Sequence, residues 1–174
     1  LDGRAVRTPG GKPQIVPAKT LAEALAQEWA DQGEAINTRA FPMRDLADFA
    51  LDAVSGDRAA TIAELVKYAG TDTLCYRGDE GEALHQRQLE VWEPLLAAAE
   101  ERWDVHFARI SGIVHQPQPD ETLARMAGIL EAESTFTLAA LRMLVSLSAS
   151  LVIGLAAIAP GADARRLWAA ANLE

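Results

Sequence analysis

The feature that most constrains this chain is a run of 17 uncharged residues from Met143 to Ala159. Such a run is at the lower limit of what spans a bilayer, and it otherwise forms a helix inside a protein. Ser146, Ser148 and Ser150 interrupt its apolar side chains, and no aromatic belt flanks it. We therefore expect residues 136–159 to form one buried central helix of a bundle, with a membrane span as the alternative.

The composition is that of a folded and mostly helical protein. The chain has 174 residues, of which 49% are apolar and 24% charged, so it holds one medium domain, or one with a small appendage, and is not wholly disordered. Alanine, the strongest helix former, occurs 34 times. The net charge of −9 and the lack of a basic stretch argue against nucleic-acid binding. The single cysteine, Cys75, excludes an internal disulfide and favours a reducing compartment.

Residue spacing predicts a short β segment followed by several helices. Residues 5–8 and 14–17 are typical of two short strands around a Gly/Pro turn. Helical spacing of apolar residues is found within 20–33, 46–54, 57–68, 84–92, 95–103 and 123–130, and Pro94 predicts a break. Residues 105–114 alternate, which indicates a strand or an extended connector. The predicted fold class is α+β, mostly helical.

No pattern for catalysis, cofactor binding or metal binding is present in the sequence. His85, His106 and His115 lack the spacing of a zinc protease helix, and Cys75 has no cysteine companions for a structural zinc site. Gly10-Gly11-Lys12 lacks the first glycine and the hydroxyl residue of a phosphate-binding loop. There is also no Gly-x-Gly-x-x-Gly after a strand. We predict no catalytic residues, no metal and no cofactor.

Three positions are open to both a structural and a functional interpretation. Asp72 lies in a Thr-Asp-Thr turn and predicts a cap, with a partner-facing carboxylate as the alternative. Cys75, between Leu74 and Tyr76, fits a buried inert thiol better than a nucleophile. Trp92 precedes Glu93 and Pro94, a combination that interrupts a helix and suggests an interface anchor as well as a core residue.

Several motifs occur together in an order that resembles a known chaperone family. They are Glu28-Trp29, Phe41-Pro42-Met43, Gly70-Thr71-Asp72-Thr73-Leu74-Cys75-Tyr76-Arg77, Arg87-Gln88 with Trp92-Glu93-Pro94-Leu95-Leu96, Gly112-Ile113, and Ser148-x-Ser150-Leu151-Val152-x-Gly154-Leu155-Ala156. Together they resemble the assembly-chaperone family that binds the alpha subunit of the ATP synthase catalytic sector. The resemblance covers nearly the whole chain.

The resemblance implies a non-enzymatic chaperone that holds the unassembled alpha subunit until the beta subunit replaces it. It also implies a small N-terminal β-containing part and a larger C-terminal helical bundle, which we place at residues 1–40 and 41–174. The chain departs mildly from the family at Phe41-Pro42-Met43-Arg44 and at Trp92-Glu93-Pro94. Because a helical pattern stops at Glu174 without a cap, we expect the family's C-terminal segment to be missing.

We predict that Asp72, Arg77, Trp92, Glu93 and Glu174 contribute to partner binding, either by contact or by shaping the surface. A net charge of −9 would steer such a chaperone towards basic patches on its partner. The alternative function is a small cofactor-free acidic hydrolase, in which Asp72 or Glu93 works with a histidine about 3 Å away.

The predicted compartment follows from the source of the chain. We expect a cytoplasmic location in a bacterium and the mitochondrial matrix in a eukaryote. We predict that the chain neither binds nucleic acid nor inserts stably into a membrane. Thirteen arginines against three lysines favour a GC-rich bacterial gene.

Overall fold

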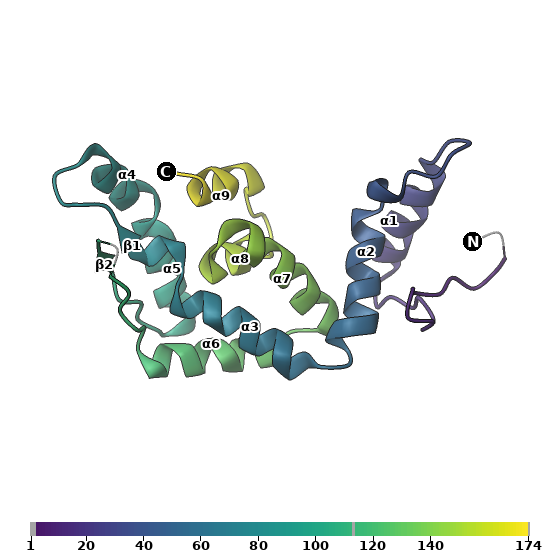
Figure 1. Cartoon of the computed structure of the whole chain (residues 1–174), viewed down its shortest axis with the longest axis horizontal. Helices are drawn as coiled ribbons and strands as arrows, with labels where there is room; N and C mark the ends of the chain where they lie inside the picture. Colours follow the sequence, from purple (N-terminus) through teal and green to yellow (C-terminus); the bar gives the residue numbers. More distant parts are fainter. Residues whose placement is uncertain (1–2, 113, 174) are drawn as a thin grey trace. The chain divides into compact units, whose positions relative to one another are not determined.

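Helices make up most of the structure, which is a computed structural model describing residues 3–112 and 114–173 (Figure 1). This confirms the mostly helical α+β class. The chain forms two compact units, one combining Leu1–Arg58 with Ser134–Ala140 and the other combining Ala59–Glu133 with Leu141–Glu174. The division predicted at residues 1–40 and 41–174 stays a prediction.

Besides the start of α7 (Thr135–Ser148), the described part of the first unit contains two α-helices and two short helical segments. They are α1 (Lys19–Ala30), η1 (Thr38–Ala40), α2 (Pro42–Phe49) and the π-helical turn η2 (Ala50–Val54), which continues α2. The Trp29 ring packs on the buried Phe41 ring with 4.6 Å between centroids. The Glu28 carboxylate accepts hydrogen bonds from the backbone N–H groups of Met43 and Arg44, at 2.7 and 2.9 Å. Glu28 therefore fixes the start of α2 by satisfying its free donors.

The N-terminal strands predicted at residues 5–8 and 14–17 are reduced to one antiparallel bridge between Arg7 and Pro13. The prediction of two strands is wrong because Pro13 and Pro17 have no N–H with which to extend a ladder. The turn is held instead by Asp52 of η2, whose carboxylate accepts hydrogen bonds from the Thr8 hydroxyl (2.7 Å) and the Gly10 N–H (2.8 Å). These contacts stabilise a segment too short to be stable alone.

The second unit carries most of the helices and the only sheet among the described residues. Its elements are α3 (Arg58–Gly70), η3 (Thr73–Cys75), β1 (Tyr76–Arg77), α4 (Ala83–Val91), α5 (Glu93–Trp103), β2 (Ile110–Ser111), α6 (Asp120–Ala132), the later part of α7 (Thr135–Ser148), α8 (Leu151–Ala157) and α9 (Ala164–Ala171). The two strands pair in parallel, Tyr76 with Ile110 and Arg77 with Ser111. The predicted break near Pro94 is confirmed, because α4 ends and α5 begins at Trp92.

The apolar run from Met143 to Ala159 does not form one helix, so that prediction is wrong. The chain leaves α7 at Ala149, whose φ of 50° lies in the left-handed region, and α8 begins after Ser150. The Ser150 hydroxyl caps the new helix by accepting a hydrogen bond from the Ile153 N–H at 3.0 Å. Within the described residues, no helix combines the length and apolarity that a membrane span needs.

Candidate functional site

Asp72 is buried in the second unit and joins two segments that are distant in the sequence. One carboxylate oxygen accepts a hydrogen bond from the Leu74 N–H at 3.1 Å, and the other accepts one from the Val152 N–H at 3.0 Å. The first bond caps η3 and the second satisfies a free donor in the first turn of α8. Burial raises the pKa of Asp72 to about 6, although these hydrogen bonds act in the opposite direction.

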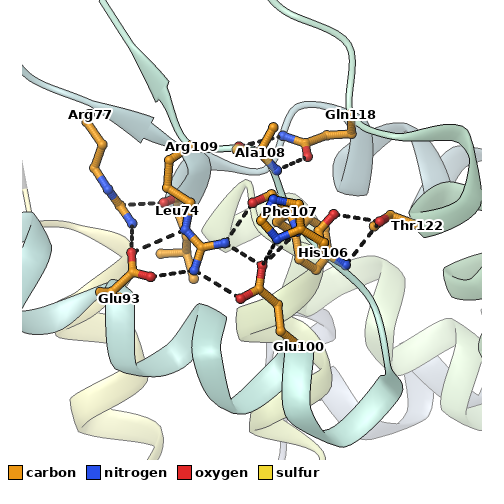
Figure 2. Close-up of polar contacts among 10 residues, drawn as sticks. All are labelled: Leu74, Arg77, Glu93, Glu100, His106, Phe107, Ala108, Arg109, Gln118 and Thr122. Atoms are coloured by element: carbon orange, nitrogen blue, oxygen red, sulfur yellow. Dashed lines mark hydrogen bonds and ion pairs between the residues drawn. The ribbon is translucent and has the colours of Figure 1, made fainter.

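A cluster of two arginines and two glutamates lies next to β1 and α5 (Figure 2). Arg77 of β1 bonds Glu93 through Nη2 and Oε2 at 2.9 Å, and its Nη1 donates to the Leu74 carbonyl. Arg109, in the connector after α5, donates to both Glu93 and Glu100. Leu74 thus links this cluster to Asp72 through its own N–H and carbonyl group.

Mutual neutralisation keeps the charged groups of this cluster ionised. The hydrogen bond from Arg109 is the largest influence on Glu93 and lowers its pKa. Burial opposes ionisation of Glu100, but bonds from Arg109 and from the Phe107 N–H prevail and lower its pKa. Burial lowers the pKa of Arg77. Burial acts in the same direction on Arg109, but the bonds with the two glutamates prevail and raise its pKa. The result is a fixed set of charges that is partly exposed, with 39% of the Glu93 side chain in solvent.

Trp92 connects the cluster to the last helix of the unit. Its side chain is 1% exposed, and its indole N–H donates to the Ala170 carbonyl of α9 at 2.8 Å. The Arg77 guanidinium carbon lies 5.4 Å from the centre of the Trp92 ring, a cation–π distance. Arg77 therefore contacts both Glu93 and Trp92, and a change at either one alters the environment of a buried cation.

The described residues around the cluster offer no reactive group. Cys75 is buried, and burial together with the Asp72 charge raises its pKa to about 12, so its thiol stays protonated. His106 bonds Glu100, His85 bonds the Gly78 carbonyl, and His115 bonds the Tyr76 hydroxyl. None of these bonds pairs a histidine with either carboxylate of the hydrolase alternative. No group of three or more potential metal ligands occurs in residues 3–112 and 114–173.

The structure brings four of the five predicted partner-binding residues into one connected region. Arg77, Trp92 and Glu93 touch one another, and Asp72 joins them through Leu74. Asp72, Arg77 and Trp92 are buried, so only Glu93 among the four offers substantial surface. Glu174 lies outside the described residues.

Sequence reasoning missed Glu100 and Arg109. Glu100 stands seven positions after Glu93, and residues seven apart lie on the same face of a helix, so this spacing was a usable signal. Arg109 lies in a connector without regular structure, and no local pattern indicates that its side chain returns to α5. Its place follows only from the tertiary fold.

The chain is similar to known proteins along its whole length. Residues 1–100 match the model of a family described as ATP12 chaperone protein. The solved structure of the D202K mutant of Atp12p from Paracoccus denitrificans is 36% identical, with a TM-score of 0.94 over 99% of this chain and 74% of that chain. Another structure of Atp12 from that organism is 35% identical and has a TM-score of 0.92 over 98% and 73%. The structure of the Atu1473 protein from Agrobacterium tumefaciens is 33% identical and has a TM-score of 0.94, over 99% of this chain and 65% of that chain.

Proposed function

The chain belongs to the ATP12 chaperone family, and from its place as a non-enzymatic chaperone of ATP synthase assembly we propose that it binds the unassembled alpha subunit. It shields the interface that this subunit later presents to the beta subunit, and it releases the alpha subunit when the beta subunit arrives. An unassembled subunit exposes apolar surface that otherwise aggregates, so its holder needs a complementary surface and no chemistry.

One observation carries this proposal: the fold matches that of Atp12p over 99% of the chain at 36% identity. The local chemistry supports it, because the most polar buried region contains charges that bind one another and a thiol held in its protonated form. The net charge of −9 supports steering towards a basic partner. The acidic hydrolase is not proposed, because Asp72 and Glu93 bond backbone N–H groups and arginines.

We assign different roles to the predicted partner-binding residues. Glu93 has the exposure needed for contact with the partner, together with the edge of Arg109, whose side chain is 24% exposed. Asp72, Arg77 and Trp92 act through the shape of the surface, because their side chains are buried. Glu174 stays a proposed contact.

Co-expression tests the function directly. The ATP synthase alpha subunit is produced with and without this chain, and the fraction remaining in the supernatant is measured. We expect the alpha subunit to stay in solution only when the chain is present. The beta subunit, produced in the same way, is the control and should gain nothing. An equal fraction of soluble alpha subunit with and without the chain would refute the proposal.

The role of Glu93 is tested by comparison with an exposed glutamate nearby. Glu93→Gln removes the charge but keeps the size of the side chain, and we expect weaker capture of the alpha subunit in a pull-down. Glu90→Gln removes a charge from the exposed pair with Arg87 and should leave capture unchanged. Circular dichroism of both variants separates loss of binding from loss of fold. Equal capture by the two variants excludes a role for Glu93.

A bacterial cytoplasmic location is part of the proposal. It is supported by the bacterial sources of the similar structures and by the thirteen arginines against three lysines. Cell fractionation with an antibody to the chain tests it.

A further inference from the structure

An apolar groove lies among α7, α8 and α9, and none of its lining residues belongs to the charged cluster at Glu93. Its lining includes Leu144, Leu147, Ile153, Leu167 and Trp168. Leu147 is 61% exposed and Trp168 is 54% exposed. These are large exposures for such side chains, and an apolar hollow flanked by them is a typical seat for an apolar side chain of a binding partner.

The segment that forms this groove differs in charge from the rest of the chain. Residues 141–174 contain three arginines against one aspartate and one glutamate, although the chain has a net charge of −9. Arg142 bonds Glu64 on α3. Arg165 and Arg166 are exposed, and neither forms an ion pair with any residue that the structure describes. Arg165 lies beside the lining residue Trp168 on the surface of α9, whereas Arg166 lies on the other side of that helix, so one cation next to the groove is available to a partner.

The position of these two arginines is unfavourable for the helix that carries them. Arg165 and Arg166 are the second and third residues of α9, whose start is capped by Asp163. The positive end of the helix dipole disfavours cations there, and the stabilising choice is an acidic residue. The acidic cap Asp163 offsets part of this cost, and the exposed charge of Arg165 stays available to a partner. Arg165 is also three positions before Trp168, so both side chains lie on the same side of α9.

We propose that this groove binds a segment of the client that combines an apolar anchor with acidic residues. This proposal rests on the proposed function, in which the client is the alpha subunit, so the segment belongs to that subunit. The anchor lies against Leu147 and Trp168, and a carboxylate of the same segment binds Arg165. The attraction between the arginine and the acidic segment acts over a short distance. It is therefore compatible with the net charge of −9, which favours basic surfaces at longer range.

The decisive variant is Arg165→Glu, because its effects on binding and on stability have opposite signs. An acidic residue in the first turn of α9 favours the helix, so the thermal midpoint should stay the same or rise. Affinity for the purified alpha subunit should fall about tenfold, the size expected when an interface charge is reversed. The matched control is Arg39→Glu on η1, another exposed arginine, which should leave affinity unchanged.

The apolar part is tested by Trp168→Ser, with Ile36→Ser as the control at a similarly exposed apolar position (59% against 54%). We expect about a tenfold loss of affinity for the first and none for the second. A photoreactive phenylalanine analogue at position 168 should crosslink to the alpha subunit, in a segment containing acidic residues. A crosslink to a second copy of this chain, or to a segment without carboxylates, would overturn the proposal.

The outcomes separate this inference from the function on which it rests. If the unmodified chain binds the alpha subunit and the groove variants bind it equally well, the groove is not the binding site, and the proposed function still stands. If the unmodified chain does not bind the alpha subunit, both are refuted.

Discussion

The Asp72 carboxylate accepts a hydrogen bond from the Val152 N–H at 3.0 Å and so joins η3 to the start of α8. Because the carboxylate also caps η3, one buried side chain fixes both the turn after α3 and the break between α7 and α8. Thr73 strengthens the same junction, since its N–H and its hydroxyl both donate to the Ala149 carbonyl, at 3.1 and 3.0 Å. Hydrogen bonds from Asp72 and Thr73 therefore help to divide the apolar run of residues 143–159 into two helices.

Asp72→Ala should lower the free energy of unfolding by about 2–3 kcal/mol, because it removes a cap and leaves buried N–H groups without an acceptor. Asp72→Asn keeps one acceptor oxygen and should cost less. Urea denaturation of the three proteins measures both differences. A loss below about 0.5 kcal/mol for Asp72→Ala would mean that the two bonds contribute little beyond what solvent provides.

Asp72 also predicts a dependence of stability on pH. Its pKa is raised from 3.8 to about 6 on folding, so the folded chain binds more protons than the unfolded chain between these values. The contribution of Asp72 is therefore fully present below about pH 4 and is lost as the pH rises through 6. The difference in unfolding free energy between the wild type and Asp72→Asn should fall by about 2–3 kcal/mol over this range. A difference that is constant from pH 4 to 7 contradicts the raised pKa.

Glu93→Gln should destabilise the second unit, because Arg77 loses its carboxylate while its side chain stays 3% exposed. We expect a loss of about 1–2 kcal/mol, less than for a fully buried pair because Glu93 itself is 39% exposed. The pKa of Glu93 is lowered, so its contribution is present above about pH 4.5 and is lost as the pH falls. Urea denaturation at pH 7 and pH 3 should show the cost shrinking in acid. Glu90→Gln should show a change below about 0.5 kcal/mol at both values.

Local patterns in the sequence were sufficient for the helices from α1 to α6 and for the interruption at Pro94. Both depend on residue spacing and on the missing N–H of proline, which are local properties. The same reasoning failed at Ala149, because the apolar run itself has no proline or glycine there and the break is stabilised by Asp72 and Thr73. It failed again at residues 5–17, where the prolines outweighed the strand pattern.

The candidate site shows the same limit. Asp72, Arg77, Trp92 and Glu93 were selected as partner-binding residues from turn chemistry and family resemblance, and they are connected in the structure. Burial is what the sequence did not show, since Arg77 is a charged residue and yet its side chain is almost completely enclosed. That burial depends on a strand pairing with residues more than thirty positions later in the chain.

Trp92→Phe should weaken the attachment of α9. The substitution removes the indole N–H that donates to the Ala170 carbonyl, one of the terminal carbonyls that a helix cannot satisfy itself. We expect a loss of about 1–2 kcal/mol and faster hydrogen exchange of the α9 amides. The control is Trp103→Phe, because the Trp103 indole N–H bonds none of the residues that the structure describes. Equal exchange of α9 in both variants would show that the bond does not hold this helix.

Gly154→Ala should be destabilising because the space beside this residue is occupied. A Cβ atom at Gly154 would lie 2.5 Å from Cγ2 of Val145, closer than real contacts allow, so either the Val145 side chain or the backbone of α8 must shift. We expect a loss of about 1–3 kcal/mol in urea denaturation. Gly128→Ala on α6 is the matched control, since nothing lies within 4 Å of its added methyl group, and it should be neutral or stabilising.

The clash at Gly154 is confirmed or refuted by removing its partner. Val145→Ala alone leaves a cavity and should also be destabilising. In the double variant the alanine at 154 occupies part of that cavity, so the combined loss should be smaller than the sum of the single losses by about 1 kcal/mol or more. Strictly additive losses would mean that the cost at position 154 comes from the backbone and not from the approach of α8 to Val145.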